Sequence, residues 1–170
     1  VRSATLPNDI SYHNTHPFKW KNFLFSHNGY IKDFEKSVKK EIVKLLDYSY
    51  LSPISGNTDS EHIFFLIMQI YNQEKNLKKA IFKTIDFLTT ICEEAMLNFM
   101  LAHITEKEGF RLLATKASIN IEAPSLYYLI ENDRNIYISS EKLNKQNWKG
   151  IMDSSIIECD NNKVLISKIK

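Results

Sequence analysis

The chain has 170 residues, 44% hydrophobic and 25% charged, a composition that predicts one soluble globular domain with a full core. Its 22 basic and 20 acidic residues give a net charge of +2, which does not support a nucleic-acid-binding protein, and neither a membrane-spanning run nor a signal peptide is evident. Cys92 and Cys159 are too few and too far apart for a disulfide framework, so we expect a reducing, cytoplasmic setting.

The first predicted strand is residues 21–26, which include the apolar run 23–25 and end at a polar turn, His27-Asn28-Gly29. Beyond this turn, apolar residues recur at helical spacing with lysines and glutamates between them. This pattern predicts an amphipathic helix that continues to about Leu46. Its apolar positions are Ile31, Phe34, Val38, Ile42 and Leu45.

Two longer helices are predicted next. Residues 52–57 are rich in turn formers and predict a loop, and Thr58 with Glu61 has the spacing of a capping box. A helix should therefore begin near Asp59, and its run 63–71 is apolar nearly all round, as in a buried helix. A second helix is predicted from about 75 to 94, with one apolar stripe formed by Leu77, Ile81, Ile85, Leu88 and Ile91.

Strands dominate the rest of the chain. Strand-forming residues are concentrated at 96–104, 111–116, 126–131, 135–140, 156–159 and 164–169. The short polar segments between them suit hairpin connections. Strands that flank a pair of helices predict an α+β layered fold, with residues 1–170 as one domain.

The Asn28-Gly29 pair is the first candidate for chemistry. The Gly29 backbone N–H and the Asn28 side-chain amide would be two neutral donors aimed at one negative oxygen, which is an oxyanion hole. Asn-Gly is also the usual signal of a tight hairpin, but the helical periodicity that follows argues against a hairpin here. A strand-to-helix turn needs a glycine for conformational reasons as well, so spacing alone leaves both interpretations open.

Two charged residues are candidates for substrate binding. Asp59, in the first turn of a helix, would hold the ammonium group of an amino acid, although helix dipoles favour acidic residues at this position without any ligand. Arg2 would clamp a carboxylate through two parallel hydrogen bonds, although a lone arginine near a terminus is more often a surface residue.

The histidines and cysteines do not indicate a metal or a nucleophile. The spacing of His13, His16 and His27 matches no common zinc pattern. Cys92 lies next to an apolar helical stripe and is interpreted as a core residue. Cys159 lies in a predicted strand and gives no stronger case for nucleophilic catalysis.

Four motifs occur in a fixed order along the chain: Arg2-Ser3-Ala4-Thr5, Asn14-Thr15-His16-Pro17-Phe18, Phe25-Ser26-His27-Asn28-Gly29 and Gly56-Asn57-Thr58-Asp59-Ser60-Glu61. Read in this order, they resemble the successive motifs of the class II glutamine amidotransferases, which are N-terminal-nucleophile hydrolases. The resemblance continues through residues 123–128, 138–143 and Trp148. These segments resemble the later strands of the stand-alone branch of the family, which acts on γ-glutamyl compounds in glutathione turnover and ergothioneine synthesis.

This resemblance implies a four-layer αββα sandwich and a glutaminase or γ-glutamyl amidohydrolase without metal or organic cofactor. It implies that Arg2 binds the substrate α-carboxylate, that Asp59 binds its α-amino group, and that Asn28 and Gly29 form the oxyanion hole. Thr5 and His16 would line the pocket. The expected partner is glutamine or a γ-glutamyl small molecule, and no nucleic acid or membrane is expected.

The family attacks with a cysteine at the mature N-terminus, whereas this chain begins Val1-Arg2-Ser3. We therefore expect the catalytic cysteine and the N-terminal strands to belong to an upstream segment of the same polypeptide, and the 170-residue chain alone to be inactive. The alternatives are a separately encoded N-terminal piece and a degenerate, non-catalytic γ-glutamyl-binding or interaction module. The sequence does not identify the group attached to the γ-glutamyl moiety or the oligomeric state.

Overall fold

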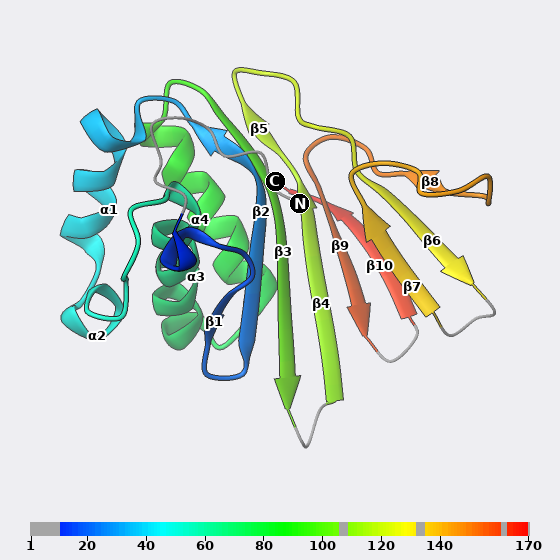
Figure 1. Ribbon diagram of the computed structural model, residues 1–170, viewed down its shortest axis with the longest axis horizontal. Coiled ribbons are helices and arrows are strands. Elements are labelled where there is room, and N and C mark those ends of the chain that lie inside the picture. Colours follow the sequence, from blue (N-terminus) through cyan, green and yellow to red (C-terminus); the bar gives the residue numbers. More distant parts are fainter. Residues whose placement is uncertain (1–10, 106–108, 132–134, 161–162, 170) are drawn as a thin grey trace. The chain divides into compact units, whose positions relative to one another are not determined.

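The computed structural model describes residues 11–105, 109–131, 135–160 and 163–169. The chain divides into two compact units: residues 1–18 with 30–93, here called the helical unit, and residues 19–29 with 94–170, here called the sheet unit. Each is described by itself below, with the elements labelled as in Figure 1.

The helical unit is built around two long helices. They are α3 (Asp59–Glu74) and α4 (Leu77–Ile91), which pack against each other, and α3 also contacts α1 (Lys39–Leu45) and α2 (Tyr48–Leu51). A 3-10 turn, η1 (Tyr12–Asn14), and a π-helical segment, η2 (Phe34–Val38), precede α1.

Helix α3 is buried along most of its length, including every residue from Asp59 to Gln69, as its uniformly apolar run predicted. The next helix is amphipathic, and Leu77, Ile81, Ile85 and Leu88 of the predicted stripe are buried. The helices are separated by Lys75, which is left-handed with φ 54°, and by Asn76, whose side chain caps α4 by accepting from Lys79 N–H at 3.0 Å. The predicted start at 75 is therefore corrected to Leu77.

The strands belong to the sheet unit, apart from Phe18 and residues 30–31 at the ends of the first two, and they form two sheets in the part of the chain that the structure describes. The larger has the order β1-β2-β3-β4-β9-β10, with β5 paired to β3, and the smaller has the order β7-β6-β8 (Figure 1). The bounds are β1 (Phe18–Trp20), β2 (Phe23–Ile31), β3 (Ala95–Thr105), β4 (Gly109–Lys116), β5 (Ser118–Ile119), β6 (Tyr127–Glu131), β7 (Asn135–Ser139), β8 (Lys149–Gly150), β9 (Ser155–Asp160) and β10 (Lys163–Lys168).

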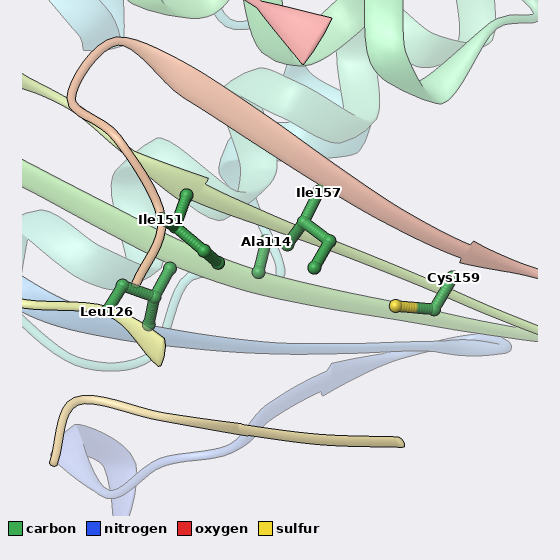
Figure 2. Packing of buried hydrophobic residues seen from close by; sticks show 5 residues of the cluster. All are labelled: Ala114, Leu126, Ile151, Ile157 and Cys159. Atoms are coloured by element: carbon green, nitrogen blue, oxygen red, sulfur yellow. The ribbon is translucent and has the colours of Figure 1, made fainter. Parts of the chain in front are cut away.

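The two sheets of this unit share one apolar cluster. Ala114 of β4 and Ile157 and Cys159 of β9 meet Leu126 and Ile151, which adjoin the ends of β6 and β8 (Figure 2). Partly buried residues of both sheets complete the cluster: Met100, Leu112, Tyr128, Ile136, Ile138 and Val164. Alternate residues of each strand lie on the same face of its sheet, and the residues of this cluster lie where the two sheets pack together.

The predicted hairpins are confirmed, since β3–β4, β6–β7 and β9–β10 are antiparallel neighbours. The short strands β1, β5 and β8 were not predicted, because two or three residues carry too little periodicity. The α+β class is confirmed.

Two local predictions near the first strand were wrong. Strand β2 does not end before His27-Asn28-Gly29 but continues through them to Ile31, and the first helical residues are Phe34–Val38. Leu45 was predicted to face the core but is 47% exposed, whereas Leu46 is buried. The reason is that α1 ends at Leu45 and the backbone of Leu46 is extended. The side chain of Leu46 therefore takes the buried place that was predicted for Leu45.

Candidate functional site

Gly29 lies where strand β2 has no room for a side chain. A Cβ atom built on Gly29 would lie 2.0 Å from the carbonyl oxygen of Met96 and 2.7 Å from Nε2 of His27. Gly29 is absent from the residues with positive φ, so this glycine is required by the close approach of strand β3 rather than by a turn.

His27 fills the space above Gly29. Because side chains two residues apart in a strand share a face, the ring of His27 leans over the position where Gly29 has none. Its Nε2 lies 2.8 Å from Met96 O, and its ring makes an edge contact with Phe99 at a centroid distance of 5.2 Å. A carbonyl oxygen only accepts hydrogen bonds, so Nε2 carries the proton and donates.

Asn28 faces the other way. It lies between His27 and Gly29 in the strand, so its side chain emerges on the opposite face, where the residue is exposed. The side-chain amide is therefore accessible for a ligand, as the oxyanion interpretation requires.

Asp59 is the first residue of α3, in the helical unit, and its carboxylate is held by donors from two segments. Oδ2 accepts from the Ile31 N–H at 2.8 Å, and Oδ1 accepts from the Ser60 N–H at 2.7 Å and the Ser60 hydroxyl at 3.1 Å. The positive end of the α3 dipole also favours this buried charge. The predicted helix-start position is confirmed, and the carboxylate is fixed in one orientation.

The loop before α3 is tied down by Glu61 and Asn14. The Glu61 carboxylate accepts from the Gly56 N–H at 2.7 Å and the Ser55 N–H at 3.1 Å. Asn14 forms two hydrogen bonds with Asn57, at 2.9 and 3.1 Å. The capping box is thus confirmed in one half only: Thr58 Oγ1 accepts from the Glu61 N–H at 3.2 Å, but the carboxylate binds the preceding loop instead of the cap residue.

His16 belongs to the helical unit, is half-buried and precedes Pro17 through a cis peptide bond. Its ring packs edge-on against Phe18 at a centroid distance of 4.9 Å. Arg2 and Thr5, the other predicted substrate contacts, lie outside the described residues.

The predicted site residues thus fall in two groups. Asn28 and Gly29 belong to the sheet unit, and His16 and Asp59 belong to the helical unit. Their convergence on one pocket stays a prediction.

Both cysteines have the properties of core residues. Burial raises the pKa of Cys92 to about 11, with a smaller contribution from the negative charge of Asp59. Burial likewise raises the pKa of Cys159 to about 11, with a smaller contribution from Glu158. The thiolate is the nucleophile, so thiols protonated at neutral pH are inert. This supports the interpretation of Cys92 as a core residue and the expectation that neither cysteine is the nucleophile.

In the ranges that the structure covers, no three His, Cys, Asp or Glu side chains are grouped so that they could hold a metal ion. Within the same ranges, no helix has the length and apolar character needed to cross a membrane.

The contact of His27 with Met96 was not predicted from the sequence, where His27 was considered as a metal ligand and as part of a turn. The available signal was its position two residues before Gly29, which places both on one face if the segment is a strand. Its partner Met96 is 69 residues further along the chain, and no local pattern indicates that contact.

Residues 1–114 match the family model of the class II glutamine amidotransferases, so the chain belongs to this family. Among characterised sequences, it is 29% identical to the probable glutamine amidotransferase DUG3 of Saccharomyces cerevisiae. That alignment covers 99% of this chain but 58% of the yeast protein, so the chain spans little more than half the length of this relative.

Solved structures show the same fold. A class II glutamine amidotransferase domain protein from Silicibacter pomeroyi has a TM-score of 0.71 at 22% identity, over 93% of this chain and 72% of that one. Glutamine phosphoribosylpyrophosphate amidotransferase from Bacillus subtilis has a TM-score of 0.66 at 13% identity, over 95% of this chain and 33% of that one. The predicted N-terminal-nucleophile hydrolase type of fold is therefore confirmed.

Proposed function

We propose that this chain forms the substrate-binding and oxyanion-stabilising part of a glutaminase that hydrolyses the γ-amide of glutamine or of a γ-glutamyl compound. The observation that carries the proposal is the arrangement in β2, where Asn28 presents an exposed amide next to Gly29, a glycine required by the packing of the sheet. The family match includes this segment.

The charge that develops in amide hydrolysis defines the role of this pair. When a nucleophile adds to the γ-carbonyl carbon, the carbonyl oxygen becomes an oxyanion. The Asn28 side-chain N–H and the Gly29 backbone N–H donate to this oxygen. Neutral donors fixed on a sheet stabilise the new charge without having to reorient during the reaction.

Recognition of the amino-acid end of the substrate requires two opposite charges. Asp59 receives the α-ammonium group, and its fixed orientation in α3 limits the reorganisation needed on binding. Arg2 pairs with the α-carboxylate through both of its parallel donors. Thr5 and His16 line the pocket around the side chain of the substrate.

The nucleophile in this proposal is an N-terminal cysteine that precedes the present sequence. Its sulfur attacks the γ-carbonyl carbon while its own α-amino group takes the thiol proton and passes it to the leaving nitrogen. The carbon–nitrogen bond breaks, ammonia or an amine leaves, and a γ-glutamyl thioester remains. Water then hydrolyses the thioester, releasing glutamate and restoring the thiol. The high pKa values of Cys92 and Cys159, each about 11, support a nucleophile elsewhere.

The test uses the full-length protein with its mature N-terminus, incubated with glutamine and with a series of γ-glutamyl amides and dipeptides. Release of ammonia or amine that is lost when the N-terminal cysteine is replaced by alanine would support the proposal. Activity that survives this replacement but is lost on replacing Cys92 or Cys159 would refute the assigned chemistry. Calorimetric binding of glutamine without turnover would favour the non-catalytic γ-glutamyl-binding module.

A further inference from the structure

Strands β2 and β3 approach unusually closely at one point, and His27 joins them there. The Met96 carbonyl oxygen lies within 2.0 Å of where a Gly29 Cβ would be, so it is in direct contact with the backbone of Gly29. The same oxygen accepts the His27 Nε2–H at 2.8 Å. One carbonyl thus contacts both residues that flank Asn28.

The side chain of His27 is well constrained. It is buried, and its ring packs edge-on against Phe99 of β3, which is itself fully buried. A rigid ring with a hydrogen bond at one edge and an aromatic contact on its surface fixes the distance between the two strands at Gly29.

We propose that His27 is a positioning residue for the oxyanion-binding segment, acting through Met96 rather than by contact with substrate. This inference rests on the proposed function, since it assigns a role to His27 in the reaction served by Asn28 and Gly29. The Nε2–H donation holds the Met96 carbonyl against Gly29 and so fixes the backbone that carries both oxyanion donors. A misplacement of about 1 Å in such a segment is enough to lower a rate on the order of 10²-fold.

The hydrogen bond from His27 also has an electrostatic effect that favours stabilisation of the oxyanion. The Met96 carbonyl is a negative dipole end beside the Gly29 backbone, where an anion is to be stabilised. Donation from His27 draws electron density from this oxygen and reduces its repulsion of the developing oxyanion. Neither effect requires His27 to exchange a proton.

Three single variants of the full-length protein separate this role from others. His27→Leu removes the donor, His27→Gln keeps an N–H donor with a reach similar to that of Nε2, and His13→Leu makes the same change at an exposed histidine. We expect His27→Leu to lower kcat by about 10²-fold with KM changed less than about twofold, because the oxyanion forms only in the transition state. His27→Gln should recover most of the loss with an unchanged pH profile, and His13→Leu should behave as wild type.

The kinetics also define what would overturn the proposal. If His27→Gln is as impaired as His27→Leu and both lose one limb of the pH profile, His27 transfers a proton and the positioning role is wrong. If folded His27→Leu keeps the wild-type kcat, the positioning role is equally wrong.

Hydrogen exchange measured by mass spectrometry supplies a readout independent of activity. His27→Leu should accelerate exchange in peptides covering residues 26–31, whereas His27→Gln and His13→Leu should not. Unchanged exchange in His27→Leu would refute the proposed hold on the strand. If the wild-type protein releases no ammonia from any substrate, the proposed function fails, and exchange alone then decides whether His27 fixes this segment.

Discussion

Gly29→Ala is the most direct test of the close approach between β2 and β3. The added Cβ would lie 2.0 Å from Met96 O, 2.7 Å from Met96 C and 2.7 Å from His27 Nε2. Ordinary carbon–oxygen contacts are about 3.5 Å. The overlap is therefore about 1.5 Å, and two of the three atoms are backbone, which cannot move aside by a change of rotamer.

The strands must separate to relieve this overlap, and both stability and activity should respond. Overpacking of a well-packed site costs about 1–3 kcal/mol, and the overlap with backbone places Gly29→Ala near the upper end. For a chain of this size, about 3 kcal/mol corresponds to a decrease in Tm of about 6–12 °C. Because a shift of about 1 Å displaces the oxyanion donors, kcat of the full-length protein should also fall by about 10²-fold or more.

Gly150→Ala is the matched control. At Gly150 in β8 the nearest atom to an added Cβ is Tyr127 Cε1 at 3.8 Å, an ordinary van der Waals contact. This variant should be neutral or stabilised by about 0.4–1 kcal/mol, because alanine has less freedom than glycine in the unfolded chain. Thermal unfolding followed by circular dichroism compares the two variants. Equal Tm values for Gly29→Ala and Gly150→Ala would refute the close-approach argument.

Four further predictions concern the site and the core. Asn28→Ala should lower kcat by about 10²- to 10³-fold without loss of stability, since Asn28 is exposed. Asp59→Asn should act mainly on KM, provided KM reports binding. If steady-state kinetics show a near-normal kcat for Asn28→Ala, Asn28 does not belong to the oxyanion hole. Equal effects of the two variants on kcat alone would contradict this division of roles. Gln69→Leu should destabilise the fold by about 2–3 kcal/mol in urea unfolding, because Gln69 accepts from the Asp47 N–H and donates to the Leu45 carbonyl, each at 2.7 Å. Gln73→Leu, at an exposed residue, is the control. Similar unfolding midpoints for both variants would contradict a stabilising role of the Gln69 hydrogen bonds. The raised pKa of each cysteine favours the protonated thiol in the folded state. The free energy of unfolding should therefore be unaffected below the ordinary thiol pKa of about 9 and fall as pH rises toward about 11. The double variant Cys92→Ala with Cys159→Ala should show a smaller loss.

The sequence predicts those parts of the fold in which a regular pattern extends over many residues. Helices α3 and α4 and the long strands β3, β4 and β9 have such patterns, and their predicted positions are close to the observed ones. The end of α1 was predicted one residue too late, because Leu45 and Leu46 both satisfy an apolar pattern and only the observed extended backbone of Leu46 distinguishes them.

The need for a glycine at position 29 could not be predicted correctly from the neighbouring residues alone. Asn28-Gly29 was interpreted as a turn because an apolar run ends at these polar residues and helical periodicity follows them, and the conformational freedom of glycine suits such a turn. Here glycine is needed because Met96, distant in sequence, brings its carbonyl against the strand. A long-range contact of this kind has no local signature, so the motif identified the candidate residues while the reason for the glycine came only from the structure.

Side chains alternate between the two faces of strand β2, so His27 and Gly29 can contact strand β3 while the amide of Asn28, between them, stays exposed to a ligand. His27 and Gly29 share the face that meets Met96, and this contact fixes the backbone on both sides of Asn28. The same period of two directs the Asn28 amide to the opposite face. A turn would hold these residues less rigidly, because few contacts would constrain its backbone, whereas a strand inside the sheet is constrained by neighbouring strands. An oxyanion donor benefits from this rigidity, because its contribution depends on being in place before the charge appears.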